Sequence, residues 1–280
     1  MRIHHLNCGS LCPHGARLIA GEGGLLAPAH IVCHCLAIET NDGLVLIDTG
    51  FGTDDARNPG QLGAPFRALM RPRPKVETTA LAQLEALGFA AADVRHIVTT
   101  HLDLDHAGGL PDFPEAEVHV FAPELKAALN PTLRERTRYI GGAHWRHNPR
   151  WVEHDAGGDE WFGFESVRIL PGTDAEVLLV PLVGHSRGHT AVAVKADEGW
   201  LLHCGDAYFH RDEIATPPSC PPILRGFEAL MASDNEARKA NQERLRELGS
   251  THGDEISLFC AHDPHELERA QAAGVATAAA

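Results

Sequence analysis

The fold is decided by the stretch Thr99-Thr100-His101-Leu102-Asp103-Leu104-Asp105-His106-Ala107-Gly108-Gly109. It places four side chains that can bind a metal within six positions, directly after the strand-like run 94–98. A loop can direct alternate side chains toward one point, and imidazole nitrogen with carboxylate oxygen suits zinc, manganese or iron. A polar surface turn is the simpler alternative, but later segments supply further residues of the ligand type. We therefore predict a metal-binding loop.

Three later positions complete the predicted cluster. His185 follows an apolar strand within Gly184-His185-Ser186-Arg187-Gly188-His189, where glycines allow sharp turns. Asp206 ends the strand-like run 200–205, and His262 follows the strand-like run 256–260. Each lies at the exit of a strand, where a rigid sheet can aim a side chain into a shared cleft.

Taken together, these motifs resemble those of the metallo-β-lactamase fold. The signature His101-x-x-x-Asp105-His106 comes first, followed by His185 in Gly-His-Ser-x-Gly-His, Asp206 in Gly-Asp, and His262. The resemblance covers about residues 31–265 and implies an α/β protein with an αββα four-layer sandwich. Such a sandwich has two packed mixed β-sheets with helices outside and a two-metal site along one edge. Asp48, in Leu46-Ile47-Asp48-Thr49-Gly50, is expected to support a ligand rather than to bind metal.

The resemblance implies two divalent ions, with zinc as the first expectation. The first site would use His101, Asp103, His185 and shared Asp206, and the second would use Asp105, His106, His262 and shared Asp206. The family usually has His where this chain has Asp103. A carboxylate is a harder donor, so manganese or iron is also expected at that site. The alternative is that Asp103 points away and the first site is weak or empty.

Two such ions, about 3.5–4 Å apart, can share a water and turn it into a bridging hydroxide that attacks a substrate carbonyl. The resemblance is greatest to the N-acyl-homoserine-lactone lactonases, through His101-Leu102-x-x-Asp105-His106-Ala107-Gly108 and Phe259-x-x-His262-Asp263. It implies a lactonase or esterase. Asp105 is predicted to be catalytic as well as a ligand, accepting a proton. Tyr208 is predicted to be catalytic by hydrogen-bonding the oxyanion or the leaving alkoxide, with simple packing as the alternative.

Other activities use the same nucleophile. A β-lactamase, a thioesterase, and a phosphotriester or phosphodiester hydrolase would differ in the walls of the pocket. An iron-dependent redox enzyme is a further alternative, because flavodiiron proteins share this fold and carry a carboxylate where Asp103 stands. A non-catalytic metal-binding module is less expected, since a closed structural site needs fewer ligands.

The composition fits a small-molecule enzyme. A chain of 280 residues with 44% apolar residues can bury one large core. We expect one domain over 1–280, with a core at 30–265, an N-terminal strand and loop at 1–29 and a frayed tail at 274–280. The net charge of −14 argues against nucleic acid as a partner. A small-molecule substrate and a homodimer are expected.

Two further features of the sequence concern the cellular location and the state of the cysteines. It shows neither an apolar signal core nor a run long enough to span a bilayer, so no membrane partner and a cytoplasmic location are expected. Seven scattered cysteines do not suggest a disulfide framework.

Local patterns predict the remaining elements. Residues 31–39 and 44–47 should form a hairpin, and 78–87 an amphipathic helix. Later strands, at 164–169, 176–182, 191–195 and 200–202, should build a second sheet. The predicted irregular or helical segments are a loop at 8–28, an excursion at 134–159, an extended linker at 215–222 and one helix at 227–248.

The roles of His189 and of the segment 144–154 stay open at this stage. His189 either supports a ligand or closes a turn. The segment 144–154 either walls the pocket, together with Phe209 and His210, or is solvated. Other histidines, including His96 and His119, are expected to be structural.

Overall fold

The computed structural model describes residues 1–170 and 172–278 and contains two main β-sheets. The first has the order β1-β2-β3-β4-β5-β6, in which β1–β2 and β2–β3 are antiparallel and the later pairs are parallel. The predicted hairpin is confirmed, with Thr40 paired to Gly43 at its turn. The strands are β1 (Ile3–Leu11), β2 (Ile31–Thr40), β3 (Gly43–Ile47), β4 (Val94–Val98), β5 (Glu117–Phe121) and β6 (Arg150–His154).

The second sheet has the order β13-β12-β11-β10-β9, and only its β12–β13 pair is parallel among the described strands. It confirms the predicted second sheet except at 164–169, where only 167–169 joins this sheet. Its strands are β9 (Val167–Ile169), β10 (Val177–Pro181), β11 (Thr190–Ala196), β12 (Gly199–His203) and β13 (Ile256–Phe259). A separate small hairpin joins β7 (Glu160–Trp161) and β8 (Phe164–Glu165).

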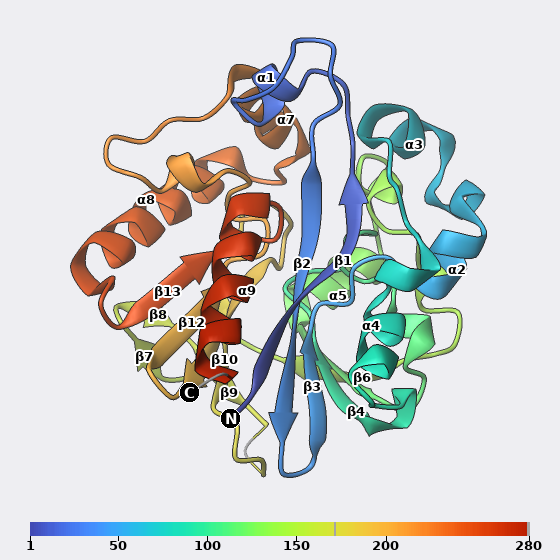
Figure 1. The fold of residues 1–280 in the computed structure, drawn as a ribbon, viewed down its shortest axis with the longest axis vertical. Coiled ribbons are helices and arrows are strands. Elements are labelled where there is room, and N and C mark those ends of the chain that lie inside the picture. Colours follow the sequence, from blue (N-terminus) through green and yellow to red (C-terminus); the bar gives the residue numbers. More distant parts are fainter. Residues whose placement is uncertain (171, 279–280) are drawn as a thin grey trace.

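Helices cover the outer faces of both sheets, so the αββα arrangement is confirmed (Figure 1). Helices α4 (Ala80–Ala86) and α5 (Ala122–Leu129) cover the first sheet, and α8 (Asn235–His252) covers the second. Helix α9 (Pro264–Ala278) packs on β1. The other helices are α1 (Ala16–Ile19), α2 (Thr53–Arg57), α3 (Ala64–Met70), α6 (Gly141–His144) and α7 (Pro222–Met231), and short 3-10 turns lie at Pro59–Leu62, Val76–Thr78, Ala91–Asp93, Leu110–Asp112, Glu135–Thr137 and Arg211–Glu213.

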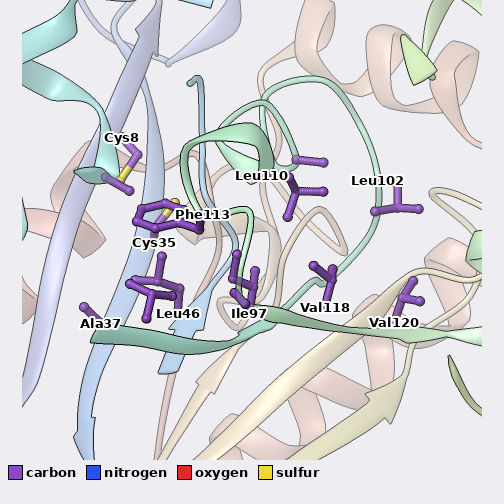
Figure 2. Close-up of a cluster of buried hydrophobic side chains, with 14 of the residues drawn as sticks. Cys8, Cys35, Ala37, Leu46, Ile97, Leu102, Leu110, Phe113, Val118 and Val120 are labelled. Carbon is purple, nitrogen blue, oxygen red and sulfur yellow. The ribbon is translucent and has the colours of Figure 1, made fainter. Parts of the chain in front are cut away.

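The apolar core has three layers because each sheet is buried on both faces. In β3, Val45 and Ile47 face the second sheet, whereas Leu44 and Leu46 face the outer helices. This alternation explains why the strand reads as a continuous apolar run. Figure 2 shows the outer cluster, in which Leu102 from the predicted metal loop is buried with residues of β4 and β5. Packing of that leucine fixes the loop that carries the ligands.

The predicted loop at 8–28 is wrong at its start. Strand β1 continues to Leu11, because Ser10 and Leu11 pair with Val32 and Ile31 after an irregularity in register. Gly9 has φ +131° at this irregularity. Pairing with β2 therefore extends the strand through a stretch whose composition suggests a turn.

The predicted excursion at 134–159 is also wrong. Residues 150–154 form β6, which pairs in parallel with β5 along the edge of the first sheet. Trp151 packs against the outer apolar cluster together with Trp145, and the buried His144 bonds Asp55 through Nε2 at 3.1 Å. The segment 144–154 thus joins the edge of the first sheet, with Trp145 and Trp151 on its outer face.

The single helix predicted at 227–248 is wrong because the chain breaks it in two. Helix α7 begins at Pro222, inside the predicted linker, where proline is favoured in the first turn. Helix α8 begins after Asp234, whose Oδ1 accepts the N–H groups of Glu236 and Ala237 at 3.0 Å each. A strong N-cap in the middle of the charged run is the local signal for this break.

Helix α9 runs to Ala278, through most of the tail predicted to fray; residues 279–280 of that tail lie outside the described residues. All seven cysteines are free thiols. Among the described residues, no helix is both long and apolar enough to cross a membrane.

Candidate metal centre

Strand exits from both sheets bring all seven predicted ligands together. One group contains His101, Asp103, His185 and Asp206, and the other contains Asp105, His106 and His262. Within each group the ligand atoms lie within 4.8 Å of one another. The first sheet supplies the loop after β4, and the second supplies the exits of β10, β12 and β13.

Asp206 faces both groups. Its Oδ2 lies 3.3 Å from Nε2 of His185 and 3.7 Å from Nε2 of His101. Its Oδ1 lies 3.1 Å from Nε2 of His106 and 3.0 Å from Nε2 of His262. Ligand atoms around a tetrahedral ion with bonds of about 2.0–2.3 Å lie about 3.3–3.8 Å apart. The separations are therefore close to those of two coordination shells that share one carboxylate.

The Asp103 carboxylate points into the first group. Its Oδ2 lies 3.2 Å from Nε2 of His185 and 3.5 Å from Nε2 of His101. The same oxygen lies 3.0 Å from Nη1 of the buried Arg138, which balances its charge. Burial alone would lower the pKa of Arg138, but Asp103 together with Tyr139, Glu124 and Asp206 outweighs burial and raises it. The sequence analysis missed Arg138, since the segment around it shows no periodic pattern.

Several buried polar atoms of the cluster lack a hydrogen-bond partner: His101 Nε2, Asp103 Oδ1 and Asp206 Oδ1. Such atoms are costly to bury unless something binds them. Burial lowers the pKa of His101 and His185 well below the ordinary value. Burial would raise the pKa of Asp206, but the surrounding imidazoles hold it well below its usual range. Neutral imidazoles beside an ionised carboxylate, as in the first group, fit a divalent cation, whereas in the second group the nearby carboxylates outweigh burial and raise the pKa of His106 and His262.

Asp48 supports the cluster through hydrogen bonds to a ligand and to its loop, as predicted. It accepts hydrogen bonds from Nδ1 of His106 at 2.8 Å, from the Thr100 N–H at 2.8 Å and from the Thr100 hydroxyl at 2.7 Å. Asp48 has φ 56°, a left-handed conformation that a non-glycine residue rarely adopts. Nδ1 of His262 similarly donates to the Val32 carbonyl at 2.7 Å. These bonds leave Nε2 of both histidines free to act as ligand atoms.

His189 supports a ligand through the backbone, which resolves the open alternative. Its Nδ1 donates to the Leu182 carbonyl at 3.0 Å, and its Nε2 accepts the N–H of Asp206 at 2.8 Å. Burial lowers the pKa of His189 to about 4, consistent with an acceptor nitrogen. Gly205, with φ 52°, brings the chain so close to His189 that a side chain would collide with the ring.

Glu124, at the start of α5, is a supporting residue that the sequence analysis missed. Its carboxylate accepts the N–H groups of Leu102 and Gly188, each at 3.0 Å, and the Ser186 hydroxyl at 2.6 Å. Glu124 thus connects the loop after β4 to the loop that carries His185. A proline-led helix start after a strand is a weak signal, and nothing local indicates that its acid is buried.

The structure places Tyr208 away from the cluster, contrary to the role predicted for it. Its hydroxyl donates to Glu266 at 3.2 Å, and its fully buried ring packs with Leu245 and Leu248 on the outer side of the second sheet. Simple packing, the alternative reading, matches this position. The next residue, Phe209, points to the cluster instead, and its ring stacks on His262 with centroids 4.8 Å apart.

A small cavity of about 20 Å³ lies beside the second group. Ile19, Ile31 and Leu224 give it an apolar wall, whereas Phe209, Arg211 and His262 line it next to the cluster. The prediction that Phe209 and His210 border a pocket agrees with this lining. The segment 144–154 does not line this cavity, because it lies at the β6 edge of the first sheet.

A two-sheet sandwich with a divided His/Asp cluster at its strand exits defines a class of metal-dependent hydrolases. The chain belongs to the metallo-β-lactamase superfamily, whose family model matches residues 30–250. A probable metallo-hydrolase of Mycobacterium tuberculosis is 44% identical over 265 residues, which cover 94% of this chain and 81% of that protein. An N-acyl homoserine lactonase of Azorhizobium caulinodans is 28% identical over 273 residues, 94% of each chain.

Solved structures agree on the fold. An N-acyl homoserine lactone hydrolase, solved with the product N-hexanoyl-L-homoserine at its catalytic metal centre, superposes with a TM-score of 0.72. The match covers 96% of this chain and 95% of that one at 21% identity. The predicted fold class and family are both confirmed.

Proposed function

We propose that this metal-dependent hydrolase binds two divalent ions, with zinc as the expected metal, and opens lactones or related carboxylic esters. The observation that carries the proposal is Asp206, whose two oxygens face the two ligand groups at 3.0–3.7 Å. The lactonase relative of Azorhizobium caulinodans supports the choice of substrate class. A homodimer and a cytoplasmic location remain predictions.

Two divalent ions, when bound, would act as Lewis acids and lower the pKa of a water that they share toward neutrality. The protein contributes the acceptor for the proton. Asp105 lies in the second group, with Oδ2 3.8 Å from Nε2 of His262, and burial raises the pKa of its carboxyl group. A carboxylate among the ligands is placed to accept the proton that the shared water would release. We assign this role to Asp105.

The residues around the small cavity beside His262 would contact the apolar tail of an ester. Phe209 holds one side of the cavity next to the ligands, and Ile19 and Leu224 extend the apolar wall outward. Arg211 is fixed by Asp263, with Nη1 3.1 Å from Oδ2, and offers a polar rim. An acyl chain would need these side chains to move apart before it could lie along the apolar residues with its carbonyl facing the ligand cluster.

The test combines elemental analysis with a substrate panel of lactones, linear esters, thioesters, β-lactams and phosphoesters. Lactone turnover that disappears with a chelator and returns with two equivalents of metal is expected. Replacing Phe209 by Ala should raise KM for long-chain lactones more than for short ones. Strong turnover of another class with none of lactones would overturn the proposal.

A substitution at Asp103 tests which metal the first group prefers. Asp103→His replaces a hard oxygen donor by imidazole, so the preference of the first group should shift toward zinc. Competition dialysis against zinc, manganese and iron measures the shift. Unchanged metal content and identity would show that Asp103 does not control that site.

The Asp103 carboxylate also favours one other candidate, an iron-dependent redox enzyme. That candidate predicts bound iron and oxygen uptake with no hydrolysis of the panel. Oxygen consumption by the iron-loaded protein separates the two functions.

A further inference from the structure

A second histidine cluster lies on the inner face of the first sheet, apart from the residues of the candidate metal centre. It comes from three neighbouring parallel strands: His96 on β4, Glu117 and His119 on β5, and His154 on β6. The ligand atoms of His96, Glu117 and His119 lie within 4.8 Å of one another. The sequence analysis expected these histidines to be purely structural.

The separations suit a shared ion. Nδ1 of His96 lies 3.1 Å from Nε2 of His119 and 3.8 Å from Oε2 of Glu117. Ligand atoms of one tetrahedral ion lie about 3.3–3.8 Å apart, so small side-chain shifts would admit a cation between them. Cross-strand neighbours on one face of a sheet hold these side chains in place.

The outer atoms of the side chains face other partners, which leaves the inner atoms for an ion. Nδ1 of His119 bonds Nε2 of His154 at 2.9 Å, so His154 sets the orientation of that ring. Nε2 of His96 faces Oδ2 of Asp42 at 3.8 Å. Oε1 of Glu117 pairs with Arg150 at 2.9 Å, while its Oε2 faces the cluster. Outer partners of this kind are typical of metal ligands.

The protonation state of the histidines and the access of solvent to the cluster also suit a bound cation. Burial, with His154 and His96 adding to it, lowers the pKa of His119 to about 3, and burial lowers the pKa of His154 as well. An open cavity of about 650 Å³ borders the cluster, between β4–β6 and the Arg168–Leu170 stretch. Solvent can therefore reach the cluster and fill any remaining coordination positions.

We propose that His96, Glu117 and His119 form an additional site for one divalent transition-metal ion, separate from the hydrolytic centre. Two imidazoles and one carboxylate, with an open side toward the cavity, suit Zn²⁺ or a neighbouring first-row ion that keeps water as a further ligand. The ion would take the place of the proton shared between His96 and His119.

The test is zinc content after equilibrium dialysis of the full-length protein. His96→Asn and Glu117→Gln should each bind one equivalent less than the parent at low free zinc, with lactone turnover kept. His252→Asn is the matched control, because His252 also pairs with a carboxylate, Glu255 at 3.1 Å, without a third ligand. The control should keep the parental zinc content.

Anomalous diffraction from a zinc-soaked crystal of the unaltered protein gives a second readout that needs no variant to fold. A zinc peak between His96 and His119 is expected. Equal zinc content in parent and His96→Asn, or no peak at this cluster, would overturn the proposal. Neither result depends on whether the main centre opens lactones, since that centre shares no ligand with this cluster.

Discussion

Arg138 compensates the negative charge of the buried Asp103 carboxylate. Its guanidinium lies 3.0 Å from Oδ2 of Asp103, and its Nη2 donates to the Met231 carbonyl at 2.8 Å. Without metal, Arg138 is the cation that this buried carboxylate faces. With metal, the carboxylate gains a second positive partner. The effect of Arg138 on stability should therefore depend on metal.

We predict that Arg138→Met lowers the free energy of unfolding of the metal-free protein by about 3 kcal/mol, because it leaves a buried charge unpaired. The loss should be clearly smaller in the metal-loaded protein. Urea unfolding with and without chelator measures both values. Arg136→Met, on the same segment but exposed, should change neither value; equal losses in both states of Arg138→Met would contradict the argument.

Tyr208 gives a second prediction at this scale. Its hydroxyl bonds Glu266 inside the outer core, so Tyr208→Phe should leave turnover within about twofold and cost about 1 kcal/mol of stability. Steady-state kinetics and thermal unfolding check the two parts. A large fall in kcat with unchanged stability would return Tyr208 to the catalytic role predicted from the sequence.

At the scale of elements, helix α9 is attached through Glu266 in its first turn. This buried carboxyl accepts the Cys260 N–H at 2.7 Å and the Tyr208 hydroxyl. Burial raises its pKa from 4.5 to about 7. The folded protein therefore holds this proton more tightly than the unfolded chain does. The resulting stabilisation is complete below about pH 4.5 and is lost as the pH rises through about 7.

We predict that Glu266→Gln removes this pH dependence, which amounts to about 3 kcal/mol between pH 4.5 and 7.5. Unfolding free energies measured in metal-loaded protein at both pH values give the slope. Glu268→Gln, on an exposed side chain of the same helix, should keep the parental slope. A parental slope in Glu266→Gln would show that another group is responsible.

Elements with strong local patterns were predictable and those defined by pairing were not. The β2–β3 hairpin and α4 follow from a turn signal and from helical spacing, so the sequence predicts them. Strand β6 has one partly buried tryptophan, Trp151, and an edge position, so its strand character depends on β5. The same holds for the site: ligands at strand exits could be found, whereas Glu124 and Arg138 become visible only once distant segments meet.

At the scale of the whole molecule, Glu124 joins the two halves of the site. It bonds Leu102 beside the ligands of the first sheet, and Ser186 and Gly188 beside His185 from the second. We predict that Glu124→Ala costs about 3 kcal/mol, because four donors, including the Tyr139 hydroxyl, lose a buried acceptor, and weakens metal binding in the first group. Calorimetric metal titration and urea unfolding measure the two effects.

Glu85→Ala, at an exposed position of α4, is the control and should bind metal as the parent does. Normal metal affinity in Glu124→Ala would show that the two loops hold their positions independently.

The spread of the ligands along the chain has a consequence for synthesis in the cell. The cluster near residue 101 emerges from the ribosome first, His185 and Asp206 follow, and His262 comes last. Domains begin to fold while translation continues, so the first sheet can form before the site has its full complement of ligands. The first group has all its ligands once Asp206 has been made, whereas the second group also needs His262, so a chain that stops between these two residues would carry only the first group complete.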